Sequence, residues 1–305
     1  MNIPSLPDFA TLAQLRMGNP QELENAKVLA HAFATFTQAF RQLIPQQQSD
    51  NWLRVSSLGK CARQLRYRKD ATPVDGKERD GRSGIVFAYG DLVEGLVTAL
   101  VEESLPEGWT FTPGNDCEAR VLRVPDPSKP GHEVDIPGHI DGLLVQGNVS
   151  YLLEIKSMTT FAFQRFEREG LGPADPYWWQ VQGYMYSATG MQDKLISSAY
   201  ILACNKDSGQ LTGCWMEPDP KFLEMLNTHL WRVMCAADTL RVTPDGKTLA
   251  PAVKLGKKNT PIKGHGVLPW NCSYCPYHRA CWPEAIEEVG RSASGAPKAV
   301  IRVES

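Results

Sequence analysis

The stretch PGHIDGLLVQGNVSYLLEIKS, residues Pro137 to Ser157, contains two apolar runs that are separated by the turn signal QGN. We expect a β-hairpin here, because a short glycine-containing turn folds the second strand back beside the first. Successive side chains of a strand point to opposite faces, so Glu154 and Lys156 project together while Ile155 faces the other way. Strand pairing would then bring Asp141 toward Glu154 and Lys156.

Two carboxylates beside a lysine suit the hydrolysis of a phosphodiester bond. Carboxylate oxygens hold Mg2+ or Mn2+, and a metal together with an ammonium group offsets the charge that grows on the phosphate. The simpler alternative for any one of these residues is a solvated charge at a strand end. However, Leu152, Leu153 and Ile155 make the neighbourhood apolar. A charge in such surroundings needs a partner, so the hairpin is a candidate site.

The composition is that of an ordinary globular protein. The 305 residues suffice for one large domain or two small ones, with 42% hydrophobic and 22% charged residues. The net charge of −2 excludes attraction of the whole molecule to nucleic acid, so local basic patches must provide it. The first residues have no signal-peptide pattern, and no apolar run is long enough to span a membrane. We therefore expect a cytoplasmic protein without membrane contact.

Apolar periodicity and turn residues outline further elements on both sides of the hairpin. We expect helices at 21–46, 85–105, 161–170, 175–190 with Gly190 as a C-cap signal, and from Asp219-Pro220 to about Leu240. We expect strands within 109–124 and a second hairpin at 195–216, followed by a loop at 247–265. This mixture predicts an α/β fold in which a central mixed β-sheet is flanked by helices.

A basic run precedes the long helix. It contains six basic residues and no acidic one, namely Arg54, Lys60, Arg63, Arg66, Arg68 and Lys69. Such a run is usually a solvated helix face. A helix that contacts the phosphates of a nucleic acid is the other interpretation, and the residues leave both open.

Three of the eight cysteines, Cys272, Cys275 and Cys281, lie within ten residues of each other. In a reducing compartment such a cluster indicates a metal centre, which needs a fourth ligand. His278 would complete a Cys3His zinc site, whereas Cys61 would complete a four-thiolate site suited to a [4Fe–4S] cluster. We interpret the scattered cysteines as core residues, namely Cys117, Cys204, Cys214 and Cys235.

The order of these features resembles the PD-(D/E)xK nuclease superfamily. Within it, the chain is similar to the iron–sulfur subset of RecB-like nucleases, which includes the AddB nuclease domain and the small nuclease of CRISPR adaptation. The resemblance runs from Cys61 to Cys281 and rests on Cys61, Glu94, Asp141, Glu154-Ile155-Lys156, Gln180-x3-Tyr184 and the three later cysteines. Residues 1–50 have no counterpart in it, and Pro137 precedes Asp141 by four residues instead of adjoining it.

The resemblance implies a restriction-endonuclease-like core and a metal-dependent DNA exonuclease. It assigns the Mg2+ or Mn2+ site to Glu94, Asp141, Glu154 and the Ile155 carbonyl. Lys156 would orient the attacking water or stabilise the phosphate, and Gln180 and Tyr184 would brace Lys156 and the DNA strand. It also favours Cys61 as the fourth ligand of a structural [4Fe–4S] cluster, with a zinc site that uses His278 as the alternative.

The same resemblance suggests a domain division and a biological setting. Residues 1–50 would be a helical extension, 51–283 the nuclease domain and 284–305 a tail. Single- or double-stranded DNA ends would be the substrate, in recombination and repair, phage DNA processing or CRISPR adaptation. A single-strand annealing protein, a helicase or a CRISPR adaptation protein could be a partner, and the chain itself has no GxxxxGK[ST] motif. A structure-specific endonuclease and an inactive nucleic-acid-binding protein are the alternatives.

Overall fold

The computed structural model describes residues 51–74, 81–188, 196–236, 241–249, 252–255, 261–267, 272, 275–283, 290–291, 297–298 and 300–302. The helix expected at 21–46 and the C-cap signal at Gly190 lie outside these residues. The chain separates into two compact units, one of residues 1–49 with 78–91 and one of residues 50–77 with 92–305. The candidate site belongs to the second unit.

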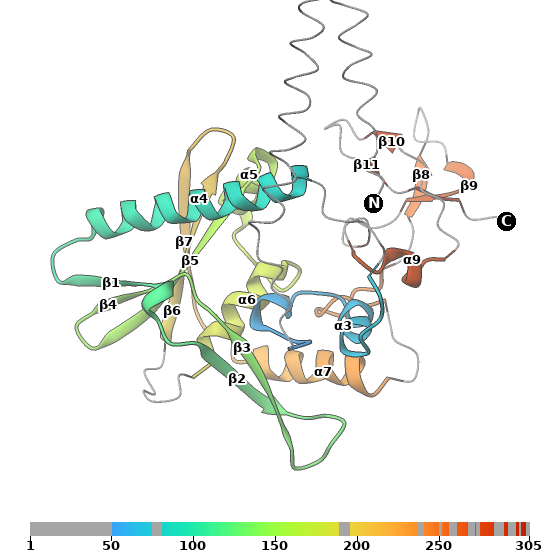
Figure 1. Ribbon diagram of the computed structural model, residues 1–305, viewed down its shortest axis with the longest axis horizontal. Coiled ribbons are helices and arrows are strands. Elements are labelled where there is room, and N and C mark those ends of the chain that lie inside the picture. The colour runs from blue at the N-terminus through green and yellow to red at the C-terminus, as the bar shows by residue number, and fades with distance from the viewer. Residues whose placement is uncertain are drawn as a thin grey trace, which may run out of the picture. The chain divides into compact units, whose positions relative to one another are not determined.

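A five-stranded sheet with the order β1-β4-β5-β6-β7 forms the centre of the second unit (Figure 1). Its strands are β1 (Trp109–Pro113), β4 (Gly142–Gln146), β5 (Val149–Met158), β6 (Ile196–Asn205) and β7 (Leu211–Met216). Strands β5 and β6 are parallel, and every other neighbouring pair is antiparallel. The expected hairpin is β4–β5, and it turns at Gly147 with a φ of +59°, which glycine adopts without steric cost. The prediction of a central mixed sheet is confirmed.

Helices pack on both faces of this sheet (Figure 1). On one face, Val93 and Val97 of α4 (Gly81–Ser104) pack with Leu153 and Ile155. The other face carries a larger core that includes Leu152 and residues from α5 (Thr160–Glu169), α6 (Pro176–Met185) and α7 (Phe222–Met234). Alternation along β5 therefore sends neighbouring leucines into opposite cores. This is the layered arrangement expected of a restriction-endonuclease-like core.

Smaller elements surround the sheet. They are η1 (Val55–Ser57), α3 (Ala62–Lys69), η2 (Gly114–Asp116), the hairpin of β2 (Arg120–Pro125) and β3 (Glu133–Gly138), and α9 (His278–Cys281). A three-stranded sheet has the order β12-β9-β8, with β8 (Ala252–Leu255), β9 (Pro261–Val267) and β12 (Val300–Arg302). A short pair joins β10 (Gly290–Arg291) to β11 (Pro297–Lys298). None of the helices among the described residues is long and apolar enough to cross a bilayer.

Several element boundaries differ from the sequence prediction. Helix α4 begins at Gly81, four residues before the expected start, because glycine weakens a helix without stopping it. Helix α7 ends at Met234, well before Leu240, and Asp219 accepts a hydrogen bond from the Lys221 N–H instead of capping the helix.

Two further expectations need correction. The segment 247–265, expected to be a loop, contains β8 and most of β9, because these two strands pair with each other and β9 also pairs with β12, which is distant along the chain. Among the four scattered cysteines, Cys204 is buried in a core, and the half-buried Cys117 and Cys214 pack against the larger core, as predicted; Cys235 is half-buried and belongs to neither core.

Candidate active site

Asp141 lies immediately before β4 and is tied to the middle of β5. Its Oδ2 accepts a hydrogen bond of 2.7 Å from the backbone N–H of Ile155. The antiparallel register places Gly142 opposite Leu153, which brings Asp141 level with Glu154. A side chain at position 142 would lie within 2.3 Å of the Phe111 ring, so glycine is required directly after Asp141. The hairpin itself therefore assembles the first pair of site residues.

The ammonium group of Lys156 joins the two carboxylates. It contacts Glu154 Oε1 directly and lies 3.9 Å from Asp141 Oδ2. The side chains of Lys156 and Asp141 are only 16% and 15% exposed, and that of Glu154 is 0% exposed. Ile155 points away from them into the core beside α4, as the alternation of a strand predicts. The structure thus brings together three of the side chains that the sequence singled out.

Helix α6 adds a second layer of contacts to this group. Gln180 Nε2 donates a hydrogen bond of 2.7 Å to Glu154 Oε1 and lies 3.5 Å from the hydroxyl of the buried Tyr184. Tyr177 places its ring centroid 5.3 Å from the Lys156 ammonium, which is within the range of a cation–π contact. The sequence analysis missed Tyr177. Its spacing of three residues before Gln180 on a helix was the signal that could have found it.

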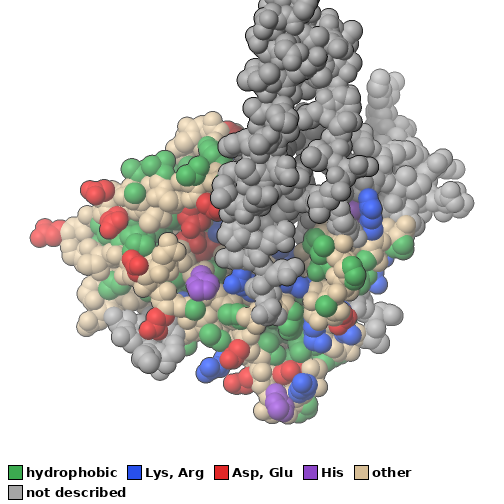
Figure 2. All heavy atoms as spheres, in the orientation of Figure 1, with side chains coloured by type: hydrophobic (Ala, Val, Ile, Leu, Met, Phe, Trp, Pro, Cys, Tyr) green, Lys and Arg blue, Asp and Glu red, His purple; other side chains and the backbone are tan. Residues whose placement is uncertain are grey.

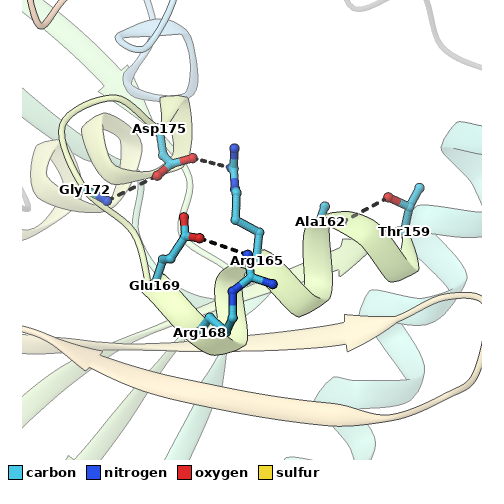
Figure 3. Close-up of polar contacts among 7 residues, drawn as sticks. All are labelled: Thr159, Ala162, Arg165, Arg168, Glu169, Gly172 and Asp175. Atoms are coloured by element: carbon cyan, nitrogen blue, oxygen red, sulfur yellow. Dashed lines mark hydrogen bonds and ion pairs between the residues drawn. The ribbon is translucent and has the colours of Figure 1, made fainter.

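The start of α6 is held by α5, as Figure 3 shows. Asp175 occupies the N-cap position of α6, and its carboxylate forms an ion pair with Arg165 and accepts a hydrogen bond of 3.3 Å from the Gly172 N–H. At the start of α5, Thr159 Oγ1 accepts a hydrogen bond from the Ala162 N–H. These contacts define where α6 begins and hence where Gln180 meets the sheet.

Burial controls the protonation of the site. It raises the pKa of Glu154 to about 8, although the neighbouring Lys156 favours the ionised form. Burial likewise raises the pKa of Asp141. For Lys156, burial alone would lower the pKa, but the two carboxylates outweigh it and the pKa is raised. Lys156 therefore stays protonated at neutral pH, and full ionisation of Glu154 calls for additional positive charge.

Several observations bear on whether a divalent cation fits the carboxylates of this site. Glu154 Oε2 is buried and has no hydrogen-bond partner within the described parts of the chain, which is the situation of a carboxylate that lacks a cation or donor. Glu94 is exposed on α4, but its charge contributes to the raised pKa of Glu154, so it lies within electrostatic reach. Among the described residues, no three His, Cys, Asp or Glu side chains are arranged to hold a metal as they stand. The donor types fit Mg2+ or Mn2+, and Lys156 contacts the carboxylates in the present arrangement.

A second cluster gathers the cysteines of the predicted metal centre. Cys61, Cys272, Cys275 and Cys281 line one pocket, and His278 also lies on its wall. All four cysteines are free thiols. Cys61 occupies the N-cap position of α3, where its sulfur accepts a hydrogen bond from the backbone N–H of Gln64. Residues 211 positions apart along the chain thus meet, and both alternatives for the fourth ligand stay within reach of the triplet.

The pocket is small and apolar. Its volume is about 10 Å3, which is room for about one water molecule. Burial raises the pKa of Cys272 to about 11 and that of Cys275 to about 12, and the neighbouring cysteines add to both shifts. The four free thiols are the donor type of a thiolate-bound metal, because their thiolate form in this pocket needs a cation, although they are not arranged to hold one as they stand.

Some arginines of the basic run form contacts with other parts of the protein. Arg66 pairs with Asp70 at 2.7 Å and lies 3.3 Å from the Val233 carbonyl oxygen, while Arg68 Nη2 lies 3.5 Å from the Asn51 carbonyl oxygen. On the face shown in Figure 2, lysine and arginine side chains gather around α3, and acidic side chains gather around α4 and β1. Basic charge therefore remains on the surface near α3, although Arg66 and Arg68 themselves have partners in the protein.

Fold and site together define a mixed α/β protein with a carboxylate–lysine group on a β-hairpin. No family profile and no curated protein matches the chain by sequence. Among solved structures it is similar to SSO0001, with 13% identity, a TM-score of 0.47 and coverage of 81% of this chain and 94% of that one. It is also similar to an alkaline exonuclease (LHK-Exo) from Laribacter hongkongensis, with 16% identity, a TM-score of 0.36 and coverage of 60% and 85%. Scores this low carry no functional argument by themselves.

Proposed function

We propose that the protein is a metal-dependent deoxyribonuclease of the PD-(D/E)xK type, and more narrowly an exonuclease of the RecB-like iron–sulfur subset. One observation carries the proposal. Across the β4–β5 hairpin, Lys156 contacts Glu154 and lies within ion-pair distance of Asp141, in a site that is almost closed to solvent. A buried lysine with two acids on interior strands of the sheet is costly unless it serves chemistry that needs those charges.

In this proposal Asp141, Glu154 and the Ile155 carbonyl hold Mg2+ or Mn2+, and Glu94 adds a contact to the same or a second ion. When bound, the ion offsets the negative charge that develops on the phosphate. The unpartnered Glu154 Oε2 and the raised pKa of Glu154 support this assignment, because added positive charge would stabilise the ionised carboxylate.

The other residues act through position and charge. Lys156 would orient the attacking water or donate to the phosphate oxygens, and its raised pKa means that it carries the positive charge this role needs. Gln180 fixes one oxygen of Glu154, so that the carboxylate keeps one orientation. Tyr184 supports Gln180 from one turn further along α6 and, with it, would steady the strand being cut.

The four cysteines would hold a structural [4Fe–4S] cluster, with a zinc site that uses His278 as the alternative. Either centre would tie the start of α3 to α9 and so close the nuclease domain of residues 51–283, between the extension 1–50 and the tail 284–305. Protein purified without oxygen is expected to be brown and to contain iron and sulfide. Colourless protein with stoichiometric zinc would favour the alternative instead.

The nuclease proposal is tested with end-labelled single- and double-stranded DNA in the presence of Mn2+. The wild type should release nucleotides from ends and lose this activity with a chelator. Asp141→Ala and Lys156→Ala, each checked for folding by circular dichroism, should be inactive. Cutting at the wild-type rate by both variants would remove the proposed mechanism.

The same assay distinguishes the alternative functions. Cleavage of closed circular DNA would indicate an endonuclease, and DNA binding without any cleavage would indicate a binding protein on a nuclease fold. Labels at the 5′ or the 3′ end report the polarity. We place the enzyme in the cytoplasm, acting on DNA ends with a single-strand annealing protein, a helicase or a CRISPR adaptation protein.

A further inference from the structure

Buried N–H groups without acceptors surround the four-cysteine pocket. Within the described residues, Arg63 Nε, Arg241 Nε and Trp282 Nε1 are buried and have no hydrogen-bond partner. Buried donors are nearly always paired, and leaving one unpaired costs about 1 to 3 kcal/mol. Three such donors beside the same four thiols indicate that an acceptor with negative charge belongs there.

Arg63 reaches the cluster from α3. Its Nη1 lies 3.9 Å from the Cys281 sulfur, which is the outer range of an N–H···S contact. Its guanidinium lies 5.9 Å from the centroid of the Tyr67 ring, and the Tyr67 hydroxyl donates to the Ala280 carbonyl oxygen at 3.1 Å. These contacts hold the cation beside the last cysteine instead of letting it extend into solvent.

Arg241 and Trp282 approach from the opposite end of the chain. The Arg241 guanidinium lies 3.5 Å from the centroid of the Trp282 ring and also donates to the Cys281 carbonyl oxygen. The buried Trp282 Nε1 has no hydrogen-bond partner within the described residues, and Trp282 lines the same pocket as Cys272. Both residues line the pocket itself.

We propose that Arg63, Arg241 and Trp282 are the charge-compensating donors of the four-cysteine centre. Four thiolates around a zinc dication or a four-iron core of the same charge leave a net charge of about −2. Two guanidinium groups match that charge, and N–H donors to ligand sulfur are a known way to stabilise such a centre. The inference rests on the metal centre proposed above and is independent of the nuclease activity.

The test measures how fast the full-length protein, purified without oxygen, releases its metal to an excess of chelator. Iron, sulfide and zinc are quantified first, so that the two kinds of centre are distinguished. Arg63→Gln should release metal several-fold faster than the wild type, and Arg63→Lys should fall between them because it keeps the charge. Trp282→Phe keeps the ring under Arg241 but loses the N–H, so it should also release metal faster.

Arg66→Gln is the matched control. Arg66 lies on the same helix, three positions after Arg63, but its contacts are with Asp70 and with α7. Its variant should release metal at the wild-type rate. The inference is overturned if Arg63→Gln and Trp282→Phe retain metal as long as the wild type, if Arg66→Gln loses it equally fast, or if the wild type binds no metal. DNA cleavage is measured in a separate assay, so the metal-release result can be interpreted even if the protein does not cleave DNA.

Discussion

The carboxylate of Asp141 and the backbone N–H of Ile155 are joined by a hydrogen bond of 2.7 Å between the start of β4 and the middle of β5. Asp141 therefore has a structural contact in addition to its proposed role at the metal. A substitution at this position affects both, and the two effects must be separated before a loss of activity can be assigned to chemistry.

The substitutions Asp141→Asn and Asp141→Ala separate the loss of the hydrogen bond to Ile155 from the loss of the carboxylate charge. The asparagine keeps an oxygen for the Ile155 N–H, so the free energy of unfolding of that variant should be close to that of the wild type. The alanine leaves the N–H unpaired, so the free energy of unfolding should fall by about 1 to 3 kcal/mol. Both should cut DNA at least about a hundredfold more slowly, because both lack the charge. Urea unfolding and end-labelled DNA assays check this. Wild-type cleavage by Asp141→Asn would show that only the hydrogen bond matters.

The raised pKa of Glu154 predicts a loss of stability as the pH rises from about 4.5 to about 8. Its pKa rises from an ordinary 4.5 to about 8 on folding, mainly through burial, so between these values the folded chain holds a proton that the unfolded chain has released. The free energy of unfolding should therefore fall by up to a few kcal/mol from about pH 4.5 to about pH 8. Glu154→Gln should show a flatter profile in urea unfolding, and Mn2+ should reduce the wild-type loss. Parallel profiles for the two proteins would contradict the assignment.

His229 predicts a loss of stability on the acidic side. It is fully buried on α7, its Nε2 donates to the Lys60 carbonyl oxygen at 3.0 Å, and burial lowers its pKa from 6.5 to about 4. Between pH 6.5 and about pH 4, His229 binds a proton in the unfolded chain but not in the folded chain. The free energy of unfolding should therefore fall by about 3 kcal/mol between pH 6.5 and pH 4.

His229→Gln keeps a donor for the Lys60 carbonyl but cannot titrate. Its unfolding free energy should change less than that of the wild type over the same pH interval, as measured by urea unfolding at several pH values. If the free energy of unfolding falls equally steeply in both proteins between pH 6.5 and pH 4, the acid-induced loss of stability comes from groups other than His229.

Two helical glycines predict opposite effects of the same substitution. A Cβ on Gly183 of α6 would lie 2.8 Å from Leu58 and 2.9 Å from Val55, and both of these side chains are fully buried. A Cβ on Gly95 of α4 would meet nothing within 4 Å. Gly183→Ala should destabilise the protein by about 1 to 3 kcal/mol, because a tightly packed core resists added volume. Gly95→Ala should stabilise it by about 1 kcal/mol through helix propensity. Thermal unfolding of the pair checks this, and stabilisation by both would mean that α6 can move away from η1.

The sequence alone determined the local parts of the site. A period of two along β5 decides that Glu154 and Lys156 share a face and that Ile155 does not, and the turn at Gly147 decides that β4 returns beside it. These are properties of neighbouring residues, so a linear pattern contains them. The order of the motifs also indicated α6 with Gln180 and Tyr184, because a helix repeats its face every three or four residues.

Only the tertiary structure decided which residues of distant segments contact each other. The contact of Tyr177 with Lys156 depends on the orientation of α6, which the ion pair of Arg165 with Asp175 helps to define. The arrival of Cys61 beside the three later cysteines depends on how α3 packs, and β9 pairs not only with its neighbour β8 but also with β12, more than thirty residues further along the chain. The approach of Arg63 and Arg241 to that pocket left no linear signal. Such contacts arise when separate elements bury their apolar faces together, and the identity of their neighbours is a property of the packed fold.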